Sequence, residues 1–172
     1  ASGGAMIYVA TGRYLGVSDL SNTQTQSVWA IRDPLTSATP ASVISPRSTL
    51  AQLTMTTNGS GTSAFRTIQC SAQCTSTEGW YVDLPDSGER VNVDPQLVLG
   101  SLVVASNVPT KNACDVGGYS WLSSFNFSNG FAVAGSPDKA VSTKVEGQAL
   151  VVGVNIVQTT DGKKHGICVN SA

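Results

Sequence analysis

Residues 79–93 have the sequence GWYVDLPDSGERVNV, and this stretch determines the fold class that we expect. From Gly79 to Leu84 the side chains alternate clearly, with the period of a β-strand that has two different faces. Turn-forming residues occupy positions 85–88. The stretch 90–93 is then expected to pair back on the first strand, which would make a β-hairpin.

Short apolar stretches separated by turn residues continue on both sides at near-regular spacing. The longest, residues 97–105, is predicted to be one strand buried on both faces. Asp161-Gly162, between two strand-like stretches, is the strongest hairpin signal in the chain, whereas residues 132–147 are polar and uninformative. The other expected strands cover residues 5–11, 27–33, 50–55, 64–69, 119–127, 149–158 and 164–169. About ten strands without a convincing helix predict an all-β sandwich, barrel or propeller.

The composition agrees with this fold class and excludes several kinds of function. Only 12% of the 172 residues are charged and the formal net charge is −1, which does not fit a nucleic-acid-binding protein or a disordered polyelectrolyte. The 22 serines and 17 threonines supply most of the polarity, and residues that favour helices are scarce. No apolar run is long enough to cross a bilayer. The length predicts a single β domain over residues 1–172.

The chain has four cysteines, which are Cys70, Cys74, Cys114 and Cys168. Four cysteines can form two disulfides in three different pairings. We favour two disulfides, one closing the short loop from Cys70 to Cys74 and one joining Cys114 to Cys168. The alternative is a zinc site made of Cys70, Cys74, His165 and Cys168, but Cys114 has no near partner for such a site. Disulfides imply an oxidising compartment and therefore a secreted protein.

The sequence contains little that predicts catalysis. It has no Gly-x-Ser-x-Gly motif, no phosphate-binding glycine-rich loop and no His-Glu-x-x-His motif. A hydrolase would have to use His165, the only histidine, together with a nearby acid or serine. We predict that the protein is not an enzyme.

The densest group of acidic residues consists of Asp83, Asp86, Glu89 and Asp94. Carboxylates at this density can bind calcium or act as an acid–base pair. Their spacing fits no EF-hand loop, however, and Arg90 lies beside Glu89. Capping of a hairpin turn explains most of the group without a ligand.

Aromatic residues offer a second interpretation, a binding surface for sugars or peptides. In strands such residues are more often part of the core. The residues concerned are Tyr8, Tyr14, Trp29, Trp80, Tyr81, Tyr119 and Trp121. They keep open the alternative of a stand-alone extracellular carbohydrate- or protein-binding β module.

Several motifs occur together in a fixed order over most of residues 5–130. They are IYVATGRYL at 7–15, QSVWAIRD at 26–33, GWYVDLP at 79–85, GERV at 88–91, DP at 94–95, and Cys114 followed by GGYSWL at 117–122. As a set they resemble the C-terminal propeller region of the PilY family, the large tip adhesins and assembly factors of bacterial type IV pili. Residues from 131 onward resemble the family only loosely.

This resemblance implies blades of a modified quinoprotein-type β-propeller, present here as a partial propeller or as a self-contained β domain. It implies a non-catalytic module at the cell surface or pilus tip that contacts minor pilins and host or abiotic surfaces. The family's calcium loop has the form Asp-x-Asn-x-Asp, which does not occur here, so calcium is expected only elsewhere in full-length members. No cofactor is expected in this chain.

The residues that match the family motifs are expected to build the fold. The resemblance implies tight turns at Gly12 and Gly118, turn caps at Asp33 and Asp94, and packing by three tryptophans. The full set of structural motif residues is Gly12, Arg13, Trp29, Asp33, Trp80, Asp94, Gly118 and Trp121. Because a whole propeller needs more blades than 172 residues supply, we expect a C-terminal fragment of a larger secreted protein that also contacts the rest of its parent chain.

Overall fold

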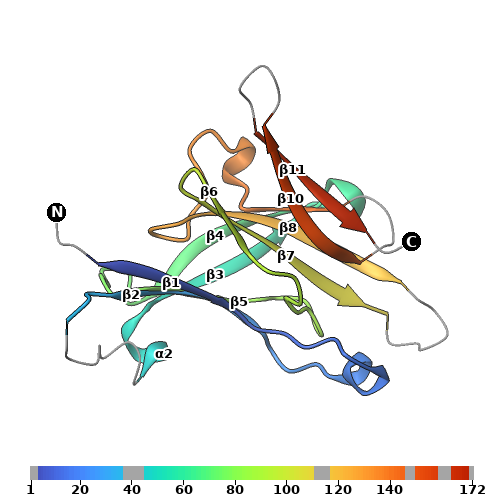
Figure 1. The fold of residues 1–172 in the computed structure, drawn as a ribbon, viewed down its shortest axis with the longest axis horizontal. Helices are drawn as coiled ribbons and strands as arrows, with labels where there is room; N and C mark the ends of the chain where they lie inside the picture. The colour runs from blue at the N-terminus through green and yellow to red at the C-terminus, as the bar shows by residue number, and fades with distance from the viewer. Residues whose placement is uncertain (1–3, 37–44, 111–116, 146–149, 159–163, 171–172) are drawn as a thin grey trace.

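The computed structural model describes residues 4–36, 45–110, 117–145, 150–158 and 164–170, with side chains as far as residue 156. The strands are β1 (Ala5–Ala10), β2 (Ser27–Asp33), β3 (Ala51–Asn58), β4 (Phe65–Ala72), β5 (Gly79–Asp83), β6 (Gln96–Val98), β7 (Ser101–Pro109), β8 (Gly118–Asn126), β9 (Ser142–Lys144), β10 (Val151–Gln158) and β11 (Lys164–Asn170). Nine of them form one sheet in the order β1-β2-β5-β3-β4-β9-β8-β7-β6 (Figure 1). The strands β10 and β11 pair as a separate hairpin.

Helical structure in the described residues is limited to single turns. They are α2 (Pro46–Thr49) and the 3-10 turns η1 (Val17–Ser21), η2 (Gly61–Ser63) and η3 (Pro137–Lys139). Neighbouring strands are antiparallel throughout the large sheet except β3 and β5, which are parallel. The all-β fold class is therefore confirmed.

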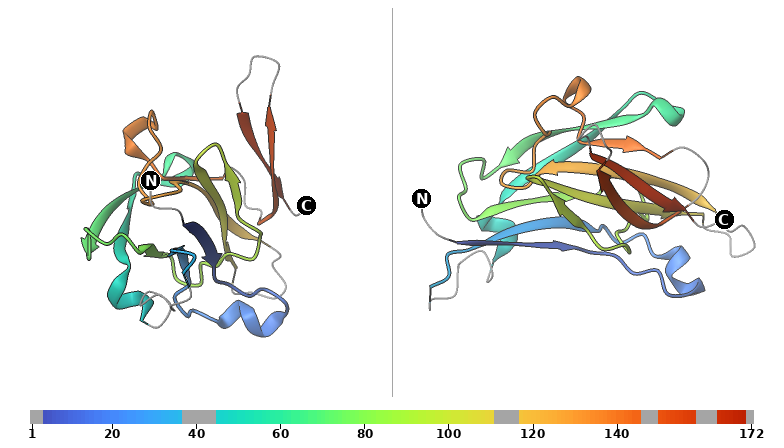
Figure 2. Two further views of the ribbon diagram at one scale, coloured as in Figure 1. Left: turned by 60° about the vertical axis from the view of Figure 1, so that its left-hand side comes forward. Right: turned by 45° about the horizontal axis from the view of Figure 1, so that its top comes forward.

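The nine-stranded sheet curls into a half-barrel whose inner face holds the main core (Figure 2). Alternation places Trp80 and Val82 of β5 inside, and the Trp80 ring lies 5.3 Å from that of Phe125 in β8. Strands from both halves of the curl thus contact each other across the interior. The remaining buried members of this core are Val28, Ala30, Ala51, Leu53, Met55, Leu84, Val91, Leu102, Val104 and Val141.

Residues 89–91 connect the two edges of the curled sheet by backbone hydrogen bonds. Arg90 exchanges both backbone hydrogen bonds with Asn107 of β7, at 2.9 and 2.8 Å. The next residue, Val91, donates its N–H to the carbonyl oxygen of Thr11, which directly follows β1. The segment therefore joins the β7 side of the sheet to the β1 side, and we call it the seam.

The β10-β11 hairpin lies outside the half-barrel, against the outer face of β7 (Figure 2). The Asn107 side chain holds it in place, since its Oδ1 accepts the Val151 N–H at 2.9 Å and its Nδ2 donates to the Val151 carbonyl at 2.8 Å. Val103 and Ala105 of β7 pack against Val154 of β10 in a second, smaller core. This explains why β7 is buried on both faces.

The tract 97–105, which we predicted to be one strand, is two strands joined by a tight turn. Leu99 and Gly100 have φ values of 47° and 78°, so the chain reverses between β6 and β7. Two consecutive residues with positive φ are the geometry of a two-residue hairpin turn. The apolar character of Leu99 concealed this turn in the sequence.

The predicted hairpin over residues 79–93 is wrong in its pairing. Strand β5 forms as expected, but it lies between β2 and β3, so both of its edges are already occupied. Residues 90 and 91 therefore pair at the seam instead. Strand β9 was not predicted, because the polar stretch 132–147 carries no alternating pattern.

Separate four-stranded propeller blades are not seen in the described residues, since nine strands share one continuous sheet. The Cys70–Cys74 disulfide is present as predicted and closes the loop after β4. The expected Cys114–Cys168 bond and the Asp161-Gly162 turn lie outside the described residues. The pairing of β10 with β11 that this turn predicted is confirmed.

We expect Gly12→Ala to destabilise the protein, because there is no room for a side chain at the seam. A Cβ atom at this position would lie 2.5 Å from both the backbone nitrogen and the carbonyl oxygen of Val91. Displacing that backbone should lower the free energy of unfolding by about 2 kcal/mol, seen as a lower Tm in thermal unfolding. The matched control is Gly16→Ala, whose Cβ meets no atom within 4 Å; an equal loss in both variants would contradict the close packing of the seam.

Candidate functional site

A buried ion pair lies on the inner face of the sheet. Arg66 of β4 and Glu89 have exposed fractions of 0% and 1%. Arg66 Nη1 donates to Glu89 Oε1 at 2.7 Å and Nη2 donates to Oε2 at 2.9 Å, which is a bidentate arrangement. Ser106 of β7 adds a hydrogen bond from its hydroxyl to Glu89 Oε1. The pair therefore links β4, β7 and the seam.

Aromatic residues of β8 and a second carboxylate surround this pair. The Arg66 guanidinium carbon lies 3.8 Å from the centre of the Trp121 ring. Asp86 Oδ2 accepts hydrogen bonds from Arg66 Nη2 at 2.8 Å, Trp121 Nε1 at 2.9 Å and the Tyr119 hydroxyl at 3.0 Å. Burial of the phenol and the negative charge of Asp86 raise the pKa of Tyr119 to about 12. We call Arg66, Asp86, Glu89, Tyr119 and Trp121 the ionic cluster.

The four acidic residues noted in the sequence do not share one site. Asp86 and Glu89 are engaged by Arg66, whereas Asp83 accepts hydrogen bonds from Arg47 at 2.9 and 3.0 Å on the outer face. Burial acts to raise the pKa of Asp83, but the hydrogen bonds from Arg47 and Ser27 and the charge of Arg47 hold it below its usual value. These carboxylates therefore stabilise arginines in separate places.

The outer-face group contains two of the aromatic residues considered as a binding surface. Trp29 and Tyr81 stack with ring centres 4.7 Å apart, and the Arg47 guanidinium lies 5.0 Å from each ring centre. Tyr81 is buried and Trp29 is half-buried in this stack. The rings are thus occupied by one another and by Arg47.

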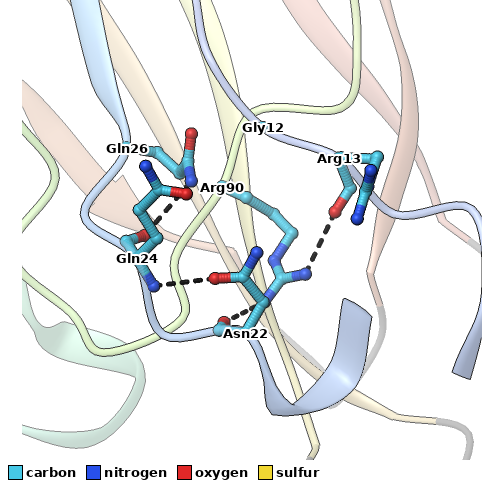
Figure 3. A pocket seen from close by; sticks show the side chains of 6 residues that line it. All are labelled: Gly12, Arg13, Asn22, Gln24, Gln26 and Arg90. Carbon is cyan, nitrogen blue, oxygen red and sulfur yellow. Dashed lines mark hydrogen bonds between the residues drawn. The ribbon is translucent and has the colours of Figure 1, made fainter. Parts of the chain in front are cut away.

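A polar pocket of about 330 Å³ opens beside the seam, and it is the candidate functional site (Figure 3). Its walls come from the segment between β1 and β2 and from the residue after Glu89. The lining residues are Gly12, Arg13, Asn22, Gln24, Gln26 and Arg90. Arginine and carboxamide side chains in one concavity favour a polar ligand that carries negative charge.

Arg90 is held in this pocket mainly by backbone carbonyl oxygens, and its guanidinium carbon also lies 5.9 Å from the centre of the Tyr14 ring. Its exposed fraction is 3%, and its guanidinium donates to the carbonyl oxygens of Gly88, Arg13, Asp19 and Asn22 at 2.6 to 3.0 Å. Figure 3 shows the hydrogen bonds to Arg13 and Asn22. Among the described residues Arg90 forms no ion pair. The charge is therefore stabilised by carbonyl dipoles and is not neutralised by a carboxylate.

Asp19 organises the loop that forms one side of the pocket. It is buried, and its carboxylate accepts the N–H groups of Leu15 and Gly16 at 2.8 and 3.2 Å and Arg13 Nε at 2.9 Å. The Leu15 hydrogen bond, with the hydrogen bond and charge of Arg13, holds the pKa of Asp19 below its usual value. The loop presents Leu15 and Val17 with exposed fractions of 88% and 71%. An ordered apolar tip thus stands next to the polar pocket.

Of the remaining motif residues, two glycines and Asp33 lie at tight backbone positions, whereas the turn cap expected at Asp94 is matched by no hydrogen bond of its side chain among the described residues. Gly12 lies at the seam, and a Cβ on Gly118 would collide with the carbonyl of Val108. Asp33 Oδ1 accepts the Leu35 N–H at 2.8 Å after β2. Asp94 is exposed.

Sequence reasoning missed Arg66 and the surroundings of Arg90. Arg66 is a single arginine in the mixed polar and apolar sequence of β4. Only the alternation that places it on the same face as Ile68 could have indicated that its side chain points inward. Arg90 reaches carbonyl oxygens about 70 residues away in the chain, as the separations of 71 and 77 show. No local pattern encodes such contacts.

The structure bears on only part of the predicted disulfides and of the alternative zinc site. The bond between Cys70 and Cys74 uses both sulfur atoms, so neither is left as a zinc ligand. The side chains of Cys114, His165 and Cys168 lie outside the described residues.

Comparisons with protein-family models, with curated proteins and with solved structures found no match to this chain. Within the described part of the chain, no helix is both long and apolar enough to cross a membrane. The pocket is therefore interpreted from its own geometry.

We expect single substitutions in the ionic cluster to be strongly destabilising. Arg66→Met would leave the Glu89 carboxylate buried without its partner, which should cost about 3–5 kcal/mol in urea unfolding. Arg66→Met combined with Glu89→Leu removes both charges and should recover part of this loss. The control Arg47→Met breaks an exposed pair and should change stability by about 1 kcal/mol or less; a similar loss in both single variants would argue against a buried pair.

We expect the stability of the protein to fall as the pH rises from about 10 to about 12. The raised pKa means that folded Tyr119 keeps its proton where an unfolded tyrosine loses it, so ionisation favours unfolding in this range. The phenolate absorbance of the wild type minus that of Tyr119→Phe should show a group titrating near pH 12. A difference spectrum that titrates at the ordinary pH of a tyrosine would contradict the hydrogen bond to Asp86.

Proposed function

We propose that the chain is a non-catalytic structural and adhesive module of a PilY-type pilus tip and assembly protein. In this proposal it is extracellular, at the cell surface or pilus tip, and it contacts minor pilins and surfaces as well as the rest of a longer parent protein. The propeller architecture implied by the resemblance belongs to this proposal, with the curled sheet as part of a larger β assembly in the parent chain.

The observation that supports the proposal is that the separate motifs of the resemblance meet in space. Gly12 of the first motif packs on Arg90 and Val91 of the GERV motif. Asp86 and Glu89, next to and within that motif, bond the Arg66 that stacks on Trp121 of the GGYSWL motif. Segments that are far apart in the chain, and that together resemble one family, thus also depend on each other physically, as the parts of one scaffold would.

The nature of these contacts favours a scaffold over an enzyme. The buried ionisable groups Arg66 and Glu89 are paired with each other, and most of the N–H groups of Arg90 donate to backbone carbonyl oxygens. Groups whose hydrogen bonds are made within the protein in this way serve to fix the fold. The hydrolase hypothesis rests on His165 alone.

The alternative, a stand-alone carbohydrate- or protein-binding β module, is favoured by a specific feature. The pocket beside Arg90 and the apolar tip at Leu15 and Val17 lie on one loop, between β1 and β2. Such a surface would serve binding in either setting. What separates the two proposals is dependence on pili.

We expect deletion of the region encoding this chain to abolish or strongly reduce surface pili in the bacterium that carries it, as counted by electron microscopy. The same module, tagged in place, should co-purify with minor pilins after crosslinking. Normal pili in the deletion strain would overturn the assembly role.

A pair of loop variants refines this experiment. Leu15→Asp places a charge on the exposed apolar tip, and Thr25→Asp is a control on the same loop with an exposed polar residue. Both should fold, because neither side chain is buried. Reduced pilin recovery in Leu15→Asp alone would identify the tip as the contact; equal recovery in both would place the contact elsewhere.

A further inference from the structure

We propose that the pocket beside the seam binds an acidic sugar unit, with the carboxylate of a uronic acid next to Arg90 and Arg13. This goes beyond the structural role proposed above and does not depend on it. The volume of about 330 Å³ lies at the lower end of the range for ligand sites, roughly 300–1,000 Å³, and suits one small ring.

The charge of the pocket suits a single carboxylate. Two arginines line it, and within the described ranges the only carboxylate bonded to either is that of Asp19. Pairing of Arg13 with Asp19 leaves the charge of Arg90 without a counterion among the described residues. One net positive charge, carried by an arginine that is itself buried, is complementary to one negative group.

Hydrogen-bond donors remain available on both arginines. Four of the five N–H groups of Arg90 have acceptors, and the second N–H of Nη2 has none in the part of the chain that is described. Arg13 uses Nε on Asp19, and its terminal nitrogens form no hydrogen bond with described residues. These nitrogens could bind a carboxylate by the strong charge-assisted hydrogen bonds that arginine forms.

The carboxamides make a sugar a better ligand than a bare carboxylate. Asn22 Nδ2 and both side-chain polar atoms of Gln24 form no hydrogen bond among the described residues, while Gln26 Nε2 donates to the Gln24 backbone carbonyl. A carboxamide both donates and accepts, which matches the ring hydroxyls of a sugar. The lining residues therefore combine one anionic subsite with several hydroxyl-binding groups.

The pocket is organised before a ligand arrives. Asn22 Oδ1 accepts the Gln24 N–H at 2.9 Å, and the Asn22 carbonyl accepts Arg90 Nη2 at 2.8 Å (Figure 3). The neighbouring turn is fixed by the Asp19 carboxylate. A site held in one conformation loses less entropy on binding, so weak polar contacts can suffice.

The test is a titration of the whole 172-residue chain with small probes, followed by NMR chemical shifts of backbone amides. D-Galacturonic acid should bind and should shift the amides of Gln24, Gln26 and Arg90. D-Galactose has the same ring without the carboxylate, and acetate has the carboxylate without the ring. Galactose and acetate should each bind at least about tenfold more weakly than galacturonic acid, which is the difference that one good charged contact supplies.

Two matched variants locate the site. Gln24→Glu adds a negative charge at nearly constant shape and should weaken the binding of galacturonic acid by about tenfold through repulsion. The binding of galactose should change little. Gln69→Glu makes the same change at an exposed position of β4 away from the pocket and should bind like the wild type.

Several binding results would each overturn the proposal. They are equal binding of galacturonic acid and galactose, binding of acetate as tight as that of the uronic acid, and shifts that fall outside residues 12–26 and 86–91. Absence of any binding at millimolar galacturonic acid, with the folded spectrum intact, would also overturn it. None of these results bears on the piliation experiment, so the two proposals fail separately.

Discussion

The buried pair of Arg66 and Glu89 is the interaction on which most of this structure depends. A guanidinium and a carboxylate inside an apolar core are tolerated only when nearly all of their hydrogen bonds are satisfied. Here Asp86, Ser106 and Thr57 supply further hydrogen bonds, and the ring of Trp121 lies against the guanidinium. The need to satisfy one buried charge therefore fixes where β7, β8 and the turn before the seam must lie, and it curls the sheet around that point.

The same constraint places the candidate pocket. Glu89 points into the core, so the next residue along an extended chain, Arg90, points the other way, toward the carbonyl oxygens of Arg13 and Asp19. One dipeptide thus couples the interior of the half-barrel to a surface site. A ligand at the pocket would contact a side chain whose position is set by the core, which is the kind of support that binding sites need.

Much of the fold could be predicted from local pattern, because strands that alternate encode their own faces. The positions of β2, β5, β8 and β10 follow from such alternation and from turn residues. What failed is pairing: residues 90–93 were expected to return on β5, yet the parallel neighbour β3 occupies that edge. A parallel pair joins strands far apart in the chain, and no local signal records it. Strand β9 and the turn at Leu99 were hidden for a similar reason, since their conformation is imposed by contacts and not by propensity.

The candidate site was harder to predict than the fold, and the motifs explain why. The GERV and TGRYL motifs were recognisable in the sequence, but their contact depends on the fold. The seam brings the two motifs together, so that Arg90 of GERV donates hydrogen bonds to carbonyl oxygens in and after TGRYL, those of Arg13 and Asp19. Carbonyl groups are present at every residue and leave no trace in a sequence. The role of Arg66 could not be predicted either, because its partners are ordinary polar residues that become buried only when the sheet curls. Long-range pairing of buried charges therefore determines the local site, and a pattern in the chain becomes informative about function only after that pairing has fixed which residues are neighbours.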